Sequence, residues 1–302
     1  MFNRRDFLLA SATLVAASLL TPAFAQTTTA PAIRRGFLKR PGCRVYYEVT
    51  GSGPAIIFAH GIGSNHLAWW QQVPHFSGRY TCVTFAHRGY PPGSEIPGGP
   101  DPRDFAGDLA ALIGHLQLAD VRLVAQSMGG WTGVEYILSF PHKVRALVLA
   151  STCGTIHRPS VPLADPQRLT EWNRQATAAR ADMQRRGISP PAGERMAREQ
   201  PALHFLYRAI ANASDAFDRE ELRKRILAMA TRPPDVLRGL AMPTLFITGD
   251  EDTTYPPFLS DALAPLMPNA KVEQVREAGH SVYFQRASVF NQLVDRFLAA
   301  VG

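Results

Sequence analysis

Five short, largely apolar segments separated by helical patterns constrain the fold of this chain more than any other feature. The segments span residues 55–58, 82–85, 122–125, 146–149 and 244–247. Strands of a parallel sheet are covered by helices on both faces, so they carry few polar side chains. Strands of this kind alternating with helices predict an α/β fold built on a parallel sheet.

The other periodic segments agree with this architecture. Val45, Tyr47 and Val49 alternate with more polar neighbours, which indicates a strand with one solvent-facing side. Helical spacing recurs in residues 105–116 and 134–138, and in a closing segment with Val289, Phe290, Leu293, Phe297 and Leu298. Residues 26–35 are polar and rich in Thr, Ala and Pro, and we predict a mobile lead-in there.

One long stretch interrupts the alternation of strands and helices. Residues 153–235 contain several helical patterns rich in Arg and Ala, but no apolar run that indicates a buried strand. Pro233 and Pro234 mark the return to the sheet pattern. We therefore predict a core in two parts, residues 26–152 and 236–302, with a helical lid between them over the site.

Length and composition agree with one large α/β domain. The chain has 302 residues, a formal net charge of +7 and 46% hydrophobic residues, which is too apolar for a disordered protein. The basic residues are scattered, many between Arg158 and Arg232, and no nucleic-acid-binding motif is present. We expect them to lie on a solvated surface. Three cysteines, at positions 43, 82 and 153, are predicted to be small buried hydrophobic residues rather than disulfide partners.

Residues 1–25 have the layout of a secretory signal. A basic start with Arg4 and Arg5 precedes an apolar stretch over residues 8–20 and the sequence Ala-Phe-Ala at 23–25. The paired arginines followed by Phe-Leu resemble a bacterial twin-arginine signal. We predict cleavage after Ala25, export to the periplasm or beyond, and no stable membrane insertion afterwards. An ordinary secretory signal and an uncleaved anchor are the alternatives.

The most specific motif is the sequence Ala-Gln-Ser-Met-Gly-Gly at residues 125–130, between a buried strand and a helix. It resembles the nucleophile elbow Gly-x-Ser-x-Gly, with Ala125 in place of the first glycine. Small residues are needed there because the strand and the helix approach closely. The alternative is a strand-to-helix turn that merely contains Ser127.

The motif resembles that of the α/β-hydrolase fold family, in which the triad follows the chain order serine, acid, histidine. Residues 250–252 (Asp-Glu-Asp) follow a buried strand, and the family pattern favours Asp252 over Asp250 and Glu251. The loop at 151–154 after the preceding strand has no carboxylate. His280, in an Ala-Gly-His turn before the last helical segment, is the matching histidine. The predicted triad is therefore Ser127, Asp252 and His280.

An oxyanion hole needs two hydrogen-bond donors directed at one point. The backbone N–H of Met128, directly after the nucleophile, is one candidate. The loop at 60–64 resembles the family's His-Gly-x motif and implies Ile62 as the second donor. We interpret His60 and Arg88 as structural residues.

The resemblance covers essentially the whole chain after residue 25, and implies an eight-stranded, mostly parallel sheet flanked by helices. It implies a small-molecule carboxylic ester or lactone as substrate. Trp69 and Trp131 lie next to the oxyanion loop or the elbow helix, and we predict that they contact the substrate. No motif indicates a metal, another cofactor or a nucleic-acid partner. Hydrolysis of a C–C bond in ring-cleavage products and cofactor-free oxygenation by the His–Asp pair remain alternatives, as does a non-catalytic receptor. The natural substrate and the oligomeric state are not predicted.

Overall fold

The short apolar segments form the centre of an eight-stranded sheet in the computed structural model, which describes residues 32–302. The strand order is β1-β2-β4-β3-β5-β6-β7-β8. β1 and β2 pair antiparallel to each other, and β2 pairs antiparallel to β4. All pairs from β4 to β8 are parallel. The predicted α/β-hydrolase fold, with a mostly parallel eight-stranded sheet flanked by helices, is confirmed.

The strands lie close to the predicted apolar runs. They are β1 (Ile33–Arg40), β2 (Cys43–Thr50), β3 (Ala55–Ala59), β4 (Thr81–Phe85), β5 (Val121–Gln126), β6 (Val144–Ala150), β7 (Thr244–Gly249) and β8 (Ala270–Val275). One expectation was wrong. β1 begins at Ile33, inside the predicted lead-in, and it escaped notice because most of its side chains are exposed at the sheet edge. The predicted export signal lies outside the described residues.

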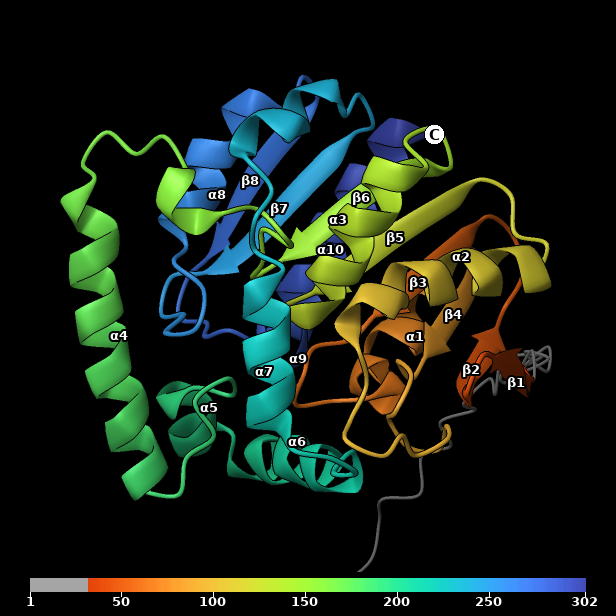
Figure 1. The fold of residues 1–302 in the computed structure, drawn as a ribbon, viewed down its shortest axis with the longest axis horizontal. Helices are drawn as coiled ribbons and strands as arrows, with labels where there is room; N and C mark the ends of the chain where they lie inside the picture. The colour runs from red at the N-terminus through yellow and green to blue at the C-terminus, as the bar shows by residue number, and fades with distance from the viewer. Residues whose placement is uncertain (1–31) are drawn as a thin grey trace, which may run out of the picture. The chain divides into compact units, whose positions relative to one another are not determined.

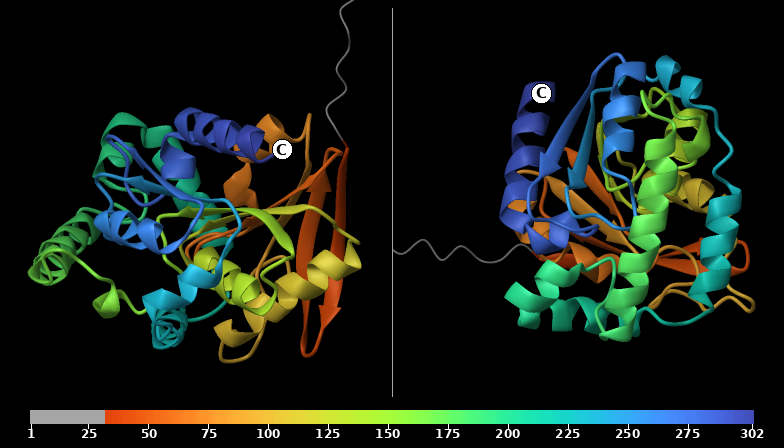
Figure 2. Two further views of the ribbon diagram at one scale, coloured as in Figure 1. Left: turned by 90° about the horizontal axis from the view of Figure 1, so that it is seen from above. Right: turned by 90° about the vertical axis from the view of Figure 1, so that its left-hand side faces the viewer.

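Helices cover both faces of the sheet, as the two views in Figure 2 show. One face carries α2 (Phe105–His115), α3 (Met128–Ser139) and α8 (Phe258–Leu263), and the other carries α1 (Gln72–Phe76) and α10 (Ala287–Val301). Successive strand residues alternate between the two layers, because side chains of a strand point to opposite faces. Ile57 belongs to the cluster around α2 and α3, whereas Ile56 and Phe58 pack on the side of α1 and α10.

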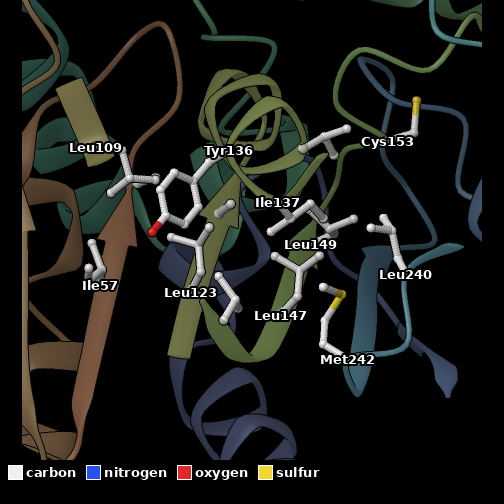
Figure 3. Packing of buried hydrophobic residues seen from close by; sticks show 14 of the residues in the cluster. Ile57, Leu109, Leu123, Tyr136, Ile137, Leu147, Leu149, Cys153, Leu240 and Met242 are labelled. Atoms are coloured by element: carbon white, nitrogen blue, oxygen red, sulfur yellow. The ribbon is translucent and has the colours of Figure 1, made fainter. Parts of the chain in front are cut away.

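The core between the sheet and α2–α3 is built mainly from aliphatic side chains, with Tyr136 and Met242 among them (Figure 3). Leu123 and Leu149 project from neighbouring strands toward Ile137 of α3 and Leu109 of α2 (Figure 3). All four are at most 2% exposed. Cys153 lies in the same cluster, and all three cysteines are free and buried, as predicted.

Four α-helices occupy the chain between β6 and β7. They are α4 (Gln167–Arg185), α5 (Glu194–Glu199), α6 (Pro201–Ala213) and α7 (Arg219–Ala228). We call residues 153–235 the helical insertion; in Figure 1 it is coloured green to cyan and lies at one end of the parallel strands. Among residues 32–302, no helix combines the length and the apolar character needed to cross a bilayer.

The two ends of the helical insertion are joined at its base. Ile156 and Arg232 form an isolated parallel bridge, and the Arg232 N–H donates to Thr155 O at 3.0 Å. Glu135 of α3 accepts from the Arg232 guanidinium at 2.7 and 3.0 Å and from the Thr155 hydroxyl at 2.6 Å. One carboxylate of the core therefore holds both ends of the insertion.

Candidate active site

Ser127 occupies a strained turn between a strand and a helix. β5 ends at Gln126 and α3 begins at Met128, and Ser127 between them has φ 49° and ψ −117°. A positive φ is uncommon for a residue with a side chain and persists only where the surrounding structure enforces it. The N–H of Ser127 donates to Ala150 O of the neighbouring strand at 3.1 Å, which helps to hold the turn.

Two glycines allow the backbone to approach this turn closely. A Cβ atom on Gly129 would overlap the carbonyl oxygen of Ala59, so only glycine lets the first turn of α3 lie against β3. A Cβ atom on Gly61 would overlap the Gln126 amide and lie 3.2 Å from Ser127 Cβ. The loop after β3 and the first turn of α3 therefore meet at Ser127.

Asp252 and His280 come from loops that follow adjacent strands, β7 and β8. The distance between His280 Nδ1 and Asp252 Oδ2 is 2.8 Å, and both side chains are buried. Asp252 Oδ1 accepts the N–H groups of Thr254 and Tyr255 at 2.7 and 2.9 Å. Because a carboxylate only accepts, Nδ1 carries the hydrogen and the lone pair of the neutral ring is on Nε2.

The other two acids of this loop have different partners. Glu251 forms an ion pair with Arg195 of α5, at 2.6 Å. Asp250 Oδ1 accepts the N–H of Ala278 at 3.3 Å. Of the three acids, Asp252 alone is bonded to His280.

Ser127, His280, Ile62, Met128 and Trp131 line one cavity of about 410 Å³. In the described part of the chain, no hydrogen bond joins the Ser127 hydroxyl to His280. Catalytic hydrogen bonds are often long or poorly aligned before substrate binds. The cavity therefore unites the predicted nucleophile, the predicted base and the predicted oxyanion loop.

The residues predicted to donate to an oxyanion are held by Tyr90. Its hydroxyl donates to Ile62 O at 2.9 Å and lies 3.5 Å from Met128 Sδ. Met128 is the first residue of α3, so its N–H has no acceptor within the helix. Tyr90 is fully buried, and burial raises the pKa of its hydroxyl. Its contribution was not predicted, because nothing in the sequence distinguishes it from a packing residue.

Trp69 does not line the cavity, contrary to the prediction of a substrate contact. Its side chain is 0% exposed and packs against Phe58 and Tyr283, with ring centres 5.0 and 4.4 Å away. The spacing of Trp69 after the oxyanion loop was misleading because its short helix, η1 (His66–Trp69), turns this side chain toward the sheet. Trp131 does line the cavity, and Trp172 of the insertion joins it there.

His60 and Arg88 have structural surroundings. His60 Nδ1 donates to Gly61 O at 2.8 Å, and its Nε2 accepts the His87 N–H at 3.0 Å. Burial lowers the pKa of His60 to about 3, so the ring stays neutral. Arg88 forms a bidentate pair with Asp108 at 2.6 and 2.7 Å. Neither residue lines the cavity.

The helical insertion contacts the loop that carries His280. Ser281 N donates to Pro191 O at 3.1 Å, and the Ser281 hydroxyl donates to the Tyr207 hydroxyl at 3.0 Å. Residues of α4 and α7 also line the cavity, so these two helices and the sheet edge enclose it. Those of α4 are Trp172, Asn173, Arg180 and Gln184, and those of α7 are Glu220, Arg223, Ile226 and Leu227.

Three arginines of the lining, Arg158, Arg180 and Arg223, were not predicted as site residues. We expected the basic residues of this region to lie on a solvated surface. These three are partly exposed, and they line the cavity as well. Helical spacing was the available signal, since Asn173, Arg180 and Gln184 repeat on one face of α4. Within residues 32–302, no group of three or more His, Cys, Asp or Glu side chains is arranged to hold a metal ion.

A family model described as alpha/beta hydrolase fold matches residues 54–287. The chain belongs to this family. The match covers the turn at Ser127, the loops of Asp252 and His280, and the whole helical insertion. The match with this alpha/beta hydrolase therefore spans all of the elements that form the cavity.

The relatives of this alpha/beta hydrolase have diverse names. A Mycobacterium tuberculosis protein named "Putative non-heme bromoperoxidase BpoC" is 28% identical over 84% of this chain and 97% of its own. The 3-oxoadipate enol-lactonase 2 of Acinetobacter baylyi is 35% identical over 34% of this chain and 39% of its own. A thermophilic esterase from Thermogutta terrifontis superimposes with a TM-score of 0.69 at 23% identity, over 89% and 99% of the two chains. The relatives support the family and fold without selecting one reaction.

Proposed function

We propose that this alpha/beta hydrolase cleaves a carboxylic ester or lactone through an acyl-enzyme on Ser127. The observation that carries the proposal is the cavity that Ser127 and His280 share, with Asp252 bonded to the far nitrogen of the imidazole. A serine hydroxyl is a weak nucleophile unless a base oriented by a third group removes its proton. Ser127, His280 and Asp252 have the chemistry that this arrangement requires.

In the proposed reaction, His280 Nε2 accepts the Ser127 proton as Oγ attacks the acyl carbon. Asp252 holds the Nδ1–H tautomer and stabilises the imidazolium that forms. The N–H groups of Ile62 and Met128 stabilise the oxyanion of the tetrahedral intermediate. His280 then protonates the leaving alkoxide, and a water molecule deprotonated by the same ring hydrolyses the acyl-enzyme.

The helical insertion acts as a lid in this proposal. Its helices α4 and α7 contribute Trp172, Ile226 and Leu227 to the wall of the cavity, opposite the sheet edge. The same two helices also contribute polar and charged side chains, which are Asn173, Arg180, Gln184, Glu220 and Arg223. The insertion therefore determines which acyl and alcohol groups reach Ser127.

The test compares Ser127→Ala with Ser151→Ala on p-nitrophenyl esters of increasing acyl length and on lactones. Ser151 is a matched control, since it follows the neighbouring strand β6, also has a positive φ (51°), and is buried away from the cavity. We expect Ser127→Ala to lower kcat/KM by at least about a thousandfold, and Ser151→Ala to retain activity. A fluorophosphonate should modify Ser127 in the native protein.

Two results contradict the proposal. Equal activity of the native protein and Ser127→Ala means that Ser127 is not the nucleophile, as expected for oxygenation by the His–Asp pair. No turnover of esters or lactones by folded native protein excludes the proposed substrates, and C–C hydrolysis of ring-cleavage products is then the next reaction to test.

A further inference from the structure

Three arginine side chains line the cavity that contains Ser127. They come from three separate segments: Arg158 from η3 (Arg158–Ser160), Arg180 from α4 and Arg223 from α7. We call them the arginine cluster. The one carboxylate in the lining is Glu220, so among the described residues the walls of the cavity carry an excess of positive charge.

Two members of the arginine cluster, Arg158 and Arg180, have no acidic partner among the described residues, unlike several other arginines of the insertion. Within residues 32–302, no carboxylate lies within 4.0 Å of the Arg158 or Arg180 guanidinium. Arg223 lies 3.4 Å from Glu220, whose side chain is 74% exposed. On the outer faces of the insertion, by contrast, Arg174 pairs with Glu171 at 2.6 Å and Arg186 pairs with Glu194 at 2.7 Å.

Like charges that meet in a confined site are unfavourable without a counterion. Burial, followed by the charges of Arg223 and Arg158, lowers the pKa of Arg180. Asp252 acts in the opposite direction on Arg180, but its oxygens already accept from His280, Thr254 and Tyr255. An anion between the arginines would relieve their repulsion.

Neighbouring groups hold the guanidinium groups of Arg180 and Arg158, whereas the Arg223 side chain is 43% exposed. Arg180 donates to Thr253 O, next to the predicted catalytic acid, and to the Thr177 hydroxyl at 2.9 Å. The Arg158 guanidinium carbon lies 5.9 Å from the Trp131 ring centre and 5.4 Å from that of Tyr255. Stacked and hydrogen-bonded guanidinium groups keep donors that can bind a carboxylate in a defined position.

We propose that the substrate of this alpha/beta hydrolase carries a carboxylate in addition to its scissile ester or lactone, and that the arginine cluster binds this carboxylate. The inference rests on the proposed function for the bond that is cleaved. The cavity of about 410 Å³ limits the substrate to a small molecule. The cluster is then a specificity determinant, and Ser127 and His280 carry out the bond cleavage.

The test uses two p-nitrophenyl esters of similar shape. One is the monoester of adipic acid, whose free end is a carboxylate, and the other is the 6-methylheptanoate, in which an isopropyl group replaces that carboxylate. We expect the native protein to prefer the adipate ester in kcat/KM by about tenfold or more, with a preference that decreases as salt is added. An equal or reversed preference would overturn the inference.

Variants assign the preference to the arginine cluster. Arg180→Gln and Arg223→Gln should reduce the ratio of the two kcat/KM values by about tenfold, mainly by raising KM for the adipate ester. Arg180→Lys and Arg223→Lys, which keep the charge, should retain much of the ratio. Arg174→Gln is the matched control, because Arg174 is on α4 but outside the cavity lining, and its ratio should equal that of the native protein. The inference would be contradicted if Arg174→Gln lost the preference for the adipate ester. It would also be contradicted if Arg180→Gln and Arg223→Gln both kept that preference.

A binding measurement separates this inference from the proposed function. Calorimetry with Ser127→Ala should detect adipate but not adipamide, and adding Arg180→Gln or Arg223→Gln should abolish the heat of binding. Adipate binding that depends on the cluster, without hydrolysis of any ester or lactone by the native protein, would support the anion site and reject the hydrolase. Hydrolysis of neutral esters without adipate binding would support the hydrolase and reject the anion site.

Discussion

The sheet and the helical insertion are stabilised in different ways. Every residue of β3, β5 and β7 is buried, and their side chains interleave with those of the covering helices. In α4, by contrast, Ala176 and Met183 are the only buried residues among 19. Surface ion pairs such as Arg174–Glu171 line its outer faces, and pairs of this kind contribute little stability.

This difference separates two properties of the site. The predicted reacting groups, Ser127, Asp252 and His280, follow β5, β7 and β8 at one edge of a rigid sheet. The arginine cluster and Trp172 come from the insertion or its base. We infer that the sheet fixes the geometry of bond cleavage and that the insertion sets the choice of substrate.

The largest expected effect concerns the acid that follows β7. Asp252→Asn should lower kcat for every substrate by about 10³–10⁴-fold, because an amide in place of the carboxylate favours the wrong imidazole tautomer. Asp250→Asn is the matched control, since Asp250 lies in the same loop but accepts from the Ala278 N–H and not from His280. Comparable losses in both variants, measured as kcat on one ester, would reject Asp252 as the residue that orients His280.

Replacing one phenylalanine in each region by alanine compares how much each side chain contributes to stability. Phe58 of β3 is 0% exposed, and Phe205 of α6 is 75% exposed. Phe58→Ala should lower the free energy of unfolding by about 3–5 kcal/mol, because it removes contacts with Trp69 and Phe76 and leaves a cavity. Phe205→Ala should change it by less than about 0.5 kcal/mol. Denaturant titration measures both values, and equal losses would contradict the contrast between sheet and insertion.

Much of the sheet could be predicted because burial on both faces leaves a pattern in the sequence. The runs at 55–58 and 244–247 contain only apolar residues and a threonine, and both are interior strands. β1 could not be predicted in this way, since an edge strand with a mostly exposed side needs no apolar run. Motif spacing likewise predicted the order of Ser127, Asp252 and His280 on strand-end loops. Their catalytic roles stay predictions.

The specificity features could not be predicted because they depend on how separate helices face each other. Arg158, Arg180 and Arg223 are far apart in the sequence, and each alone resembles the many arginines on the surface of the insertion. Trp69 shows the opposite error, because proximity in sequence to the oxyanion loop did not mean proximity to the cavity. Local periodicity predicts which side chains share one face of a helix, but not which part of the molecule that face contacts.

The smallest expected effect concerns the base of the insertion, where Glu135 binds Arg232 and Thr155. Glu135→Gln should weaken this junction by about 1 kcal/mol, since the ion pair and one of the two hydrogen bonds from Arg232 are lost at a partly exposed site. Hydrogen exchange should therefore increase in residues 153–235, and not in β3 or β5. An equal increase in the sheet would mean that the insertion does not open separately.

The effect of Glu135→Gln should depend on pH with a defined sign. The hydrogen bond from Arg232 lowers the pKa of Glu135 below its usual value of 4.5. A lowered pKa in the folded state means that the ionised form contributes stability above pH 4.5, and that this contribution is lost as pH falls through the folded-state value. The difference in exchange between the native protein and Glu135→Gln, corrected for intrinsic rates, should therefore be constant near neutrality and disappear in acid. A difference that persists unchanged below the lowered pKa would show that the charge of Glu135 does not hold the insertion to the sheet.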